Sequence, residues 1–112
     1  MAKVNSDVSS GYFKDMNDIQ RNQLISTSWE LHSTIEQSYL GLNSAKGDAG
    51  WLEKQRILLA DMALHLLQTS LKPGEIELEK LKNNLHAILT ISDQFLPHAG
   101  LKQATEKLYE GN

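Results

Sequence analysis

The chain has 112 residues, a formal net charge of −3 and no cysteine. A length of this order makes one domain with a single core, and the absence of cysteine excludes disulfides, thiolate nucleophiles, iron–sulfur clusters and cysteine-ligated zinc. Basic and acidic residues are almost balanced in both halves of the chain and no three basic residues adjoin, so a surface that neutralises nucleic-acid phosphates is not expected.

Residues 1–14 are polar and are predicted to form a flexible N-terminal arm, followed by a single helical domain over residues 15–112. The exceptions in the arm are Tyr12 and Phe13. An aromatic pair at the end of a polar tail docks in a groove, either on its own core or on a partner. The arm lacks the apolar stretch of a signal peptide, and the longest apolar run of the chain is too short to cross a membrane. We therefore expect a cytoplasmic protein without membrane contact.

Helical spacing predicts a first long helix from about residue 15 to 42. Its seam is formed by apolar and small residues and is flanked by larger ones: Leu24, Ser28, Leu31, Ile35, Ser38 and Leu42, with Ile25, His32 and Tyr39 beside them. Serine is a poor helix former and a weak core filler, so this helix depends on packing for its stability. Trp29 is predicted to be an anchor for a partner.

Residues 43–50 have the composition of a turn, and Asp48 is a plausible N-cap for a second helix that ends near Leu71. That helix is apolar on almost every side, with one narrow polar stripe of Lys54, Asp61, His65, Gln68 and Lys72. Such a helix must be surrounded. Five of its apolar residues are assigned to the core or to a homodimer interface, namely Ile57, Leu58, Leu59, Met62 and Leu66.

Pro73 is read as an opening residue of a third helix, with Glu75, Glu77 and Glu79 in its first turns. The apolar face of this helix extends to Phe95 and Leu96, and Pro97 stops it. The tail over residues 98–108 has Leu101, Ala104 and Leu108 at helical spacing, which is enough for a short fourth helix. No segment alternates apolar and polar residues as a strand does. The predicted fold is all-α: an antiparallel bundle of three main helices with a short C-terminal helix, in a homodimer.

No enzyme motif is present. A Glu-x-x-His pair, a His-Glu-x-x-His motif, a Gly-x-Ser-x-Gly elbow and a Gly-rich phosphate loop are all missing, so neither catalysis nor a cofactor or metal is expected. Asp61 lies one turn before His65, and these two residues can pair along the polar stripe. With His86 on the next helix they define one alternative, a ligand-binding or metal-binding bundle.

The function that fits these features is non-enzymatic protein binding. We expect a small bacterial-type regulator or adaptor, such as an antiactivator, inhibitor, immunity protein or chaperone, that occupies a surface of a partner protein. The other alternative is a nucleic-acid regulator. It requires a basic face built from four lysines, Lys80, Lys82, Lys102 and Lys107, which Glu79 and Glu106 weaken.

Overall fold

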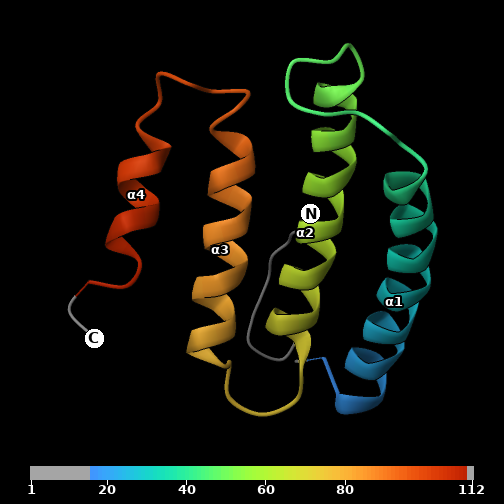
Figure 1. Cartoon of the computed structure of the whole chain (residues 1–112). Coiled ribbons are helices and arrows are strands. Elements are labelled where there is room, and N and C mark those ends of the chain that lie inside the picture. Colours follow the sequence, from blue (N-terminus) through green and yellow to red (C-terminus); the bar gives the residue numbers. More distant parts are fainter. Residues whose placement is uncertain (1–15, 111–112) are drawn as a thin grey trace, which may run out of the picture.

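The computed structural model describes residues 16–110, which contain four helices and no strand. They are α1 (Asp18–Leu40), α2 (Trp51–Leu71), α3 (Leu78–Ser92) and α4 (Leu101–Lys107) (Figure 1). The all-helical class and the order of three main helices before a short one are therefore confirmed. Tyr12 and Phe13 lie outside the described residues. No helix among those described has the length and apolar content that crossing a membrane requires.

The start of α1 is fixed by a capping box. The Asn17 side chain accepts a hydrogen bond of 2.8 Å from the backbone N–H of Gln20, and the Gln20 side chain accepts one of 3.0 Å from the backbone N–H of Asn17. The prediction that Asp48 caps α2 was wrong. Gly50 occupies the N-cap position, and the Asp48 carboxylate instead accepts a hydrogen bond of 2.8 Å from the Ala45 N–H within the preceding turn.

The third helix begins later and ends earlier than its pattern predicts. Gly74 has a φ of +94°, a left-handed conformation that interrupts a helix, so residues 72–77 form a linker and only Glu79 of the three glutamates lies in the first turn of α3. The two ends of this linker are joined by an ion pair, in which the Lys72 ammonium lies 2.9 Å from the Glu77 carboxylate. Phe95 follows the end of α3 rather than extending its face.

The helices stand side by side in chain order (Figure 1). α1 packs on α2, α2 on α3, and α3 on α4, and no other pair of the described helices brings Cα atoms within 8 Å. α1 and α3 therefore do not meet over α2, and within residues 16–110 no other helix covers the side of α2 between them.

The seam between α1 and α2 is polar. The stripe that the sequence shows on α2 faces α1: the Lys54 ammonium lies 4.9 Å from the centre of the Tyr39 ring, and the Gln68 amide donates a hydrogen bond of 3.0 Å to the Ser28 hydroxyl. At the other end of the seam the Arg21 guanidinium donates to the Leu71 carbonyl at 3.3 Å. Most of the polar stripe is thus covered by α1, although its last member, Lys72, is exposed and pairs with Glu77. The apolar residues of α2 are left for its other sides.

Apolar burial within a single chain is consequently small. Ile91, 6% exposed, is the one apolar residue among those described that is fully buried, whereas the other fully buried residues are polar: Ser28, Gln55, Asp61, Thr69 and Thr105. The α2 residues assigned to the core or to a dimer interface, Ile57, Leu58, Leu59, Met62 and Leu66, are all half-buried. A helix with this much apolar surface normally has more neighbours than α2 has here.

Candidate functional site

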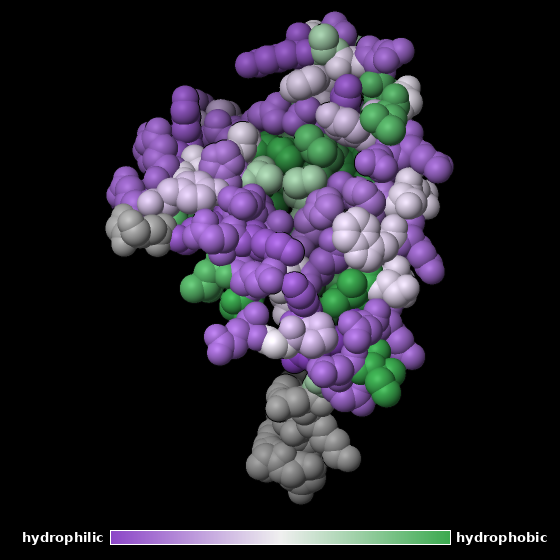
Figure 2. Space-filling view, turned by 60° about the horizontal axis from the view of Figure 1, so that its bottom comes forward, coloured by the Kyte–Doolittle hydropathy of each residue, from purple (hydrophilic) through white to green (hydrophobic). Residues whose placement is uncertain are grey.

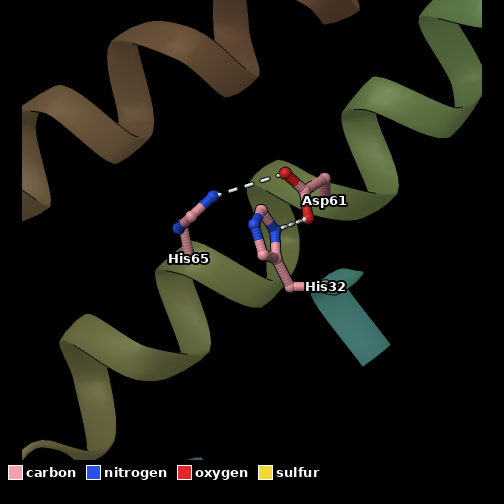
Figure 3. Close-up of side chains that lie close together, drawn as sticks. All are labelled: His32, Asp61 and His65. Carbon is pink, nitrogen blue, oxygen red and sulfur yellow. Dashed lines mark hydrogen bonds and ion pairs between the residues drawn. The ribbon is translucent and has the colours of Figure 1, made fainter. Parts of the chain in front are cut away.

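A cluster of two histidines and one aspartate lies at the middle of the α1–α2 seam (Figure 3). Asp61 is 8% exposed, and each of its carboxylate oxygens faces one imidazole. His32 Nδ1 forms a hydrogen bond of 2.5 Å with Asp61 Oδ1, and His65 Nε2 lies 3.4 Å from Asp61 Oδ2. One ligand atom from each of the three residues lies within 4.8 Å of the others.

Helical spacing and the seam contacts position these side chains. Asp61 and His65 are one turn apart on α2 and so share a face, and His32 lies one turn after Ser28 on α1. Because Ser28 is bonded to Gln68, the register of the two helices places His32 opposite Asp61. One further turn along α1, the Glu36 carboxylate lies 3.8 Å from His32 Nε2, so both nitrogens of His32 face a carboxylate.

Trp29 borders the cluster. Its ring packs edge-on against both imidazoles, with ring centres 5.3 Å from His32 and 6.0 Å from His65, while the two imidazole centres are 5.1 Å apart. Trp29 is nevertheless 49% exposed. It covers the two histidines with one side of its ring and offers the rest to solvent.

An open groove of about 580 Å³ adjoins the cluster on the side where α1 and α3 do not meet. Its walls come from α1, α2, the 72–77 linker and α3: Asn22, Ile25, Trp29, His65, Gln68, Thr69, Lys72, Pro73, Glu77, Lys80, Asn83 and Asn84. We call it the interhelical groove. Since His65 and Trp29 line it, the cluster is accessible from this side.

The sequence identified two members of the cluster and missed the third. The pairing of Asp61 with His65 is present, but His86 does not belong with them: its ring lies against Tyr109, with ring centres 5.9 Å apart. His32 takes the place that we assigned to His86. One signal in the sequence could have indicated His32. Ser28 and His32 are one turn apart on α1, so they form a polar face that can pair with the polar stripe of α2.

Large apolar side chains are also exposed along the molecule, Leu31 at 50% and Leu24 at 43% among them. Two turns separate these leucines, so they lie on one face of α1. In the view of Figure 2, patches of hydrophobic residues interrupt a mainly hydrophilic surface, and the largest lies in a hollow. Contiguous exposed apolar surface marks interaction sites more often than it marks monomer surface.

Comparison of the chain with protein-family models, with curated proteins and with solved structures finds no match.

Proposed function

We propose that this chain is a non-enzymatic, cytoplasmic protein-binding regulator that acts by occupying a surface of a partner protein. The observation that carries the proposal is the open side of α2 between α1 and α3, beside the half-exposed Trp29. Tryptophan is among the residues that contribute most to binding at protein interfaces. A tryptophan at the edge of a groove is therefore a suitable anchor point.

The chemistry of the interhelical groove favours a partner helix. Ile25, Trp29 and Pro73 supply its apolar surface, and most other lining residues are amides, hydroxyls or charged groups. An amphipathic helix laid in the groove would place apolar side chains against these three residues and polar ones against the amides. It would occupy the position beside α2 that a closed bundle gives to another helix.

Self-association in an antiparallel, dimeric bundle is part of the same proposal. The half-buried apolar residues of α2 and the exposed Leu24 and Leu31 of α1 provide apolar surface besides the groove. In a symmetric dimer, this apolar surface of one chain would pack against the same surface of the second chain.

The nucleic-acid alternative has less support. The Lys80 ammonium lies 3.1 Å from the Glu77 carboxylate and the Lys82 ammonium lies 3.5 Å from the Glu79 carboxylate. Two of the four lysines required for a basic face are thus paired with carboxylates of their own chain.

Site-specific photocrosslinking in cells that naturally contain the protein tests the proposal. A photoreactive residue at Asn22, in the wall of the groove, should crosslink to one defined protein other than this chain. The same residue at Thr27, which is exposed on the opposite side of α1, should not crosslink to that protein. The protein so identified is then purified, and Trp29→Ala should weaken its binding by about tenfold or more. Crosslinks to this chain alone, or unchanged binding by Trp29→Ala, would overturn the proposal.

Deletion of residues 1–14 examines the arm with the same purified partner. We expect the melting temperature and the oligomeric state to stay nearly unchanged while binding weakens about tenfold, because Tyr12 and Phe13 are predicted to anchor the partner. A lower melting temperature with intact binding would instead make the two aromatics part of the core.

A further inference from the structure

We propose that His32, Asp61 and His65 form a binding site for one divalent transition-metal ion, with Zn²⁺ as the representative ion. Two imidazoles and a carboxylate are the ligands that such ions take in proteins. The proposal is separate from the protein-binding function proposed above: its three ligands come from the α1–α2 seam, and one of them, His65, also lines the interhelical groove.

The distances in the cluster are close to those of a metal site. Zinc bonds of about 2.0–2.2 Å in a tetrahedron separate neighbouring ligand atoms by about 3.4 Å. His65 Nε2 and Asp61 Oδ2 are already 3.4 Å apart. His32 Nδ1 and Asp61 Oδ1, at 2.5 Å, are closer than two ligands of one ion, so the metal must replace the hydrogen bond between them. Metal binding therefore requires the His32 ring to move away from Asp61.

The groups around His32 can accommodate the ring proton that metal binding moves. A metal on His32 Nδ1 takes the place of the proton in the present hydrogen bond, and that proton moves to Nε2 of the neutral ring. Glu36 Oε2, 3.8 Å from that nitrogen, is placed to accept it. Carboxylates commonly orient metal-ligating histidines through the second ring nitrogen in this way. Protons compete with the metal for the imidazole nitrogens and the Asp61 carboxylate, so binding should weaken as the pH falls.

Three protein ligands leave one tetrahedral position open. His65 lines the interhelical groove, so that position can be reached by water or by a side chain of a bound protein. Two imidazoles do not suit Mg²⁺ or Ca²⁺, which take oxygen ligands. The site should therefore discriminate strongly between these ions and Zn²⁺.

Calorimetric titration of the metal-free full-length chain with ZnCl₂ tests the site. We expect one Zn²⁺ per chain and no binding of Mg²⁺ or Ca²⁺. His65→Ala should weaken Zn²⁺ binding at least about tenfold. The matched control, His86→Ala on α3, should bind Zn²⁺ as the unmodified chain does, since His86 contacts Tyr109 instead.

A second variant separates metal binding from folding. Asp61→Asn keeps the size of the side chain and an oxygen that can accept from His32, but removes the negative charge, so it should retain helical circular dichroism and lose Zn²⁺ affinity by a similar factor. A purely structural hydrogen bond between His32 and Asp61 predicts no saturable Zn²⁺ binding. Absence of binding, or equal affinity in His65→Ala, Asp61→Asn and the unmodified chain, would overturn the proposal.

Discussion

The Gln68 amide donates a hydrogen bond of 3.0 Å to the hydroxyl of Ser28, the most buried of the described residues. The Ser28 hydroxyl in turn donates to the Ile25 carbonyl of its own helix at 2.6 Å. A serine that appears in the sequence as a weak core filler therefore allows the close approach of α1 and α2 and fixes their register. That register is what brings His32 to Asp61.

Substitution of Ser28 should show this role directly. Ser28→Ala removes one inter-helix hydrogen bond, partly offset by better helix propensity, and should lower the free energy of unfolding by about 0.5–1 kcal/mol. Ser28→Leu should cost about 2 kcal/mol or more, because a large side chain would force the helices apart. Urea denaturation measures both, with Ser33→Ala on the exposed face of α1 as the control. A stabilised Ser28→Leu variant would contradict close packing here.

The half-buried residues of α2 predict self-association. Light scattering should give twice the chain mass of 12.6 kDa. When a second copy covers them, Leu59→Ala and Leu66→Ala should each lower stability by about 2–5 kcal/mol, the range for filled cores. The exposed Leu52 is the control, and its replacement by alanine should cost less than about 1 kcal/mol. A single-chain mass throughout the micromolar range would refute the dimer.

Acid should weaken the 72–77 linker. The ammonium groups of Lys72 and, next, Lys80 hold the pKa of Glu77 below its usual value of 4.5. A lowered folded-state pKa adds stability that is present above pH 4.5 and lost as the pH falls through the folded-state pKa. Glu77→Gln should therefore make stability less dependent on pH below this value in urea titrations. Glu75→Gln, in the same linker, should leave the dependence unchanged, and an equal effect of both would rule out a specific bridge.

Two glycines should respond oppositely to alanine. Gly74 has a φ of +94°, which alanine rarely adopts, so Gly74→Ala should lower the melting temperature, at a cost of about 1 kcal/mol. Gly41 has a φ of −76° in the helical region, and a Cβ there would make ordinary contacts. Gly41→Ala should therefore stabilise the protein by about 0.4–1 kcal/mol. The same sign for both would mean that the linker conformation does not matter to the fold.

Much of the secondary structure could be predicted because local signals specify it. The turn composition of residues 43–50 and the break at Lys72 delimit α2, and the predicted short fourth helix is present as α4. The cap of α2 was missed because Asp48 has two uses of similar value, in a helix cap or in the preceding turn. The delayed start of α3 follows from the left-handed Gly74, which the pattern of glutamates does not reveal.

The candidate site was only half predictable. Asp61 and His65 belong to one helix, and their spacing alone shows that they share a face. His32 comes from a different helix. The periodicity of a sequence shows which residues share one face of a helix, but not which faces of two helices pack together. The polar stripe was visible, yet its burial against α1 depends on the matching Ser28 and His32 of the partner helix.

Each described helix packs only against the helices next to it in the sequence, and this arrangement also affects the rate of folding. Every helix–helix contact here closes a short loop, so little chain entropy is lost before contacts form, and folding should be fast. Of the four described helices, α1 contacts only α2, so it can detach while the α2–α3 pair stays intact. Native-state hydrogen exchange should then show α1 amides opening at lower free energy than those at the middle of α3. The first helix would behave as a separate cooperative unit that exposes the polar stripe of α2 each time it opens.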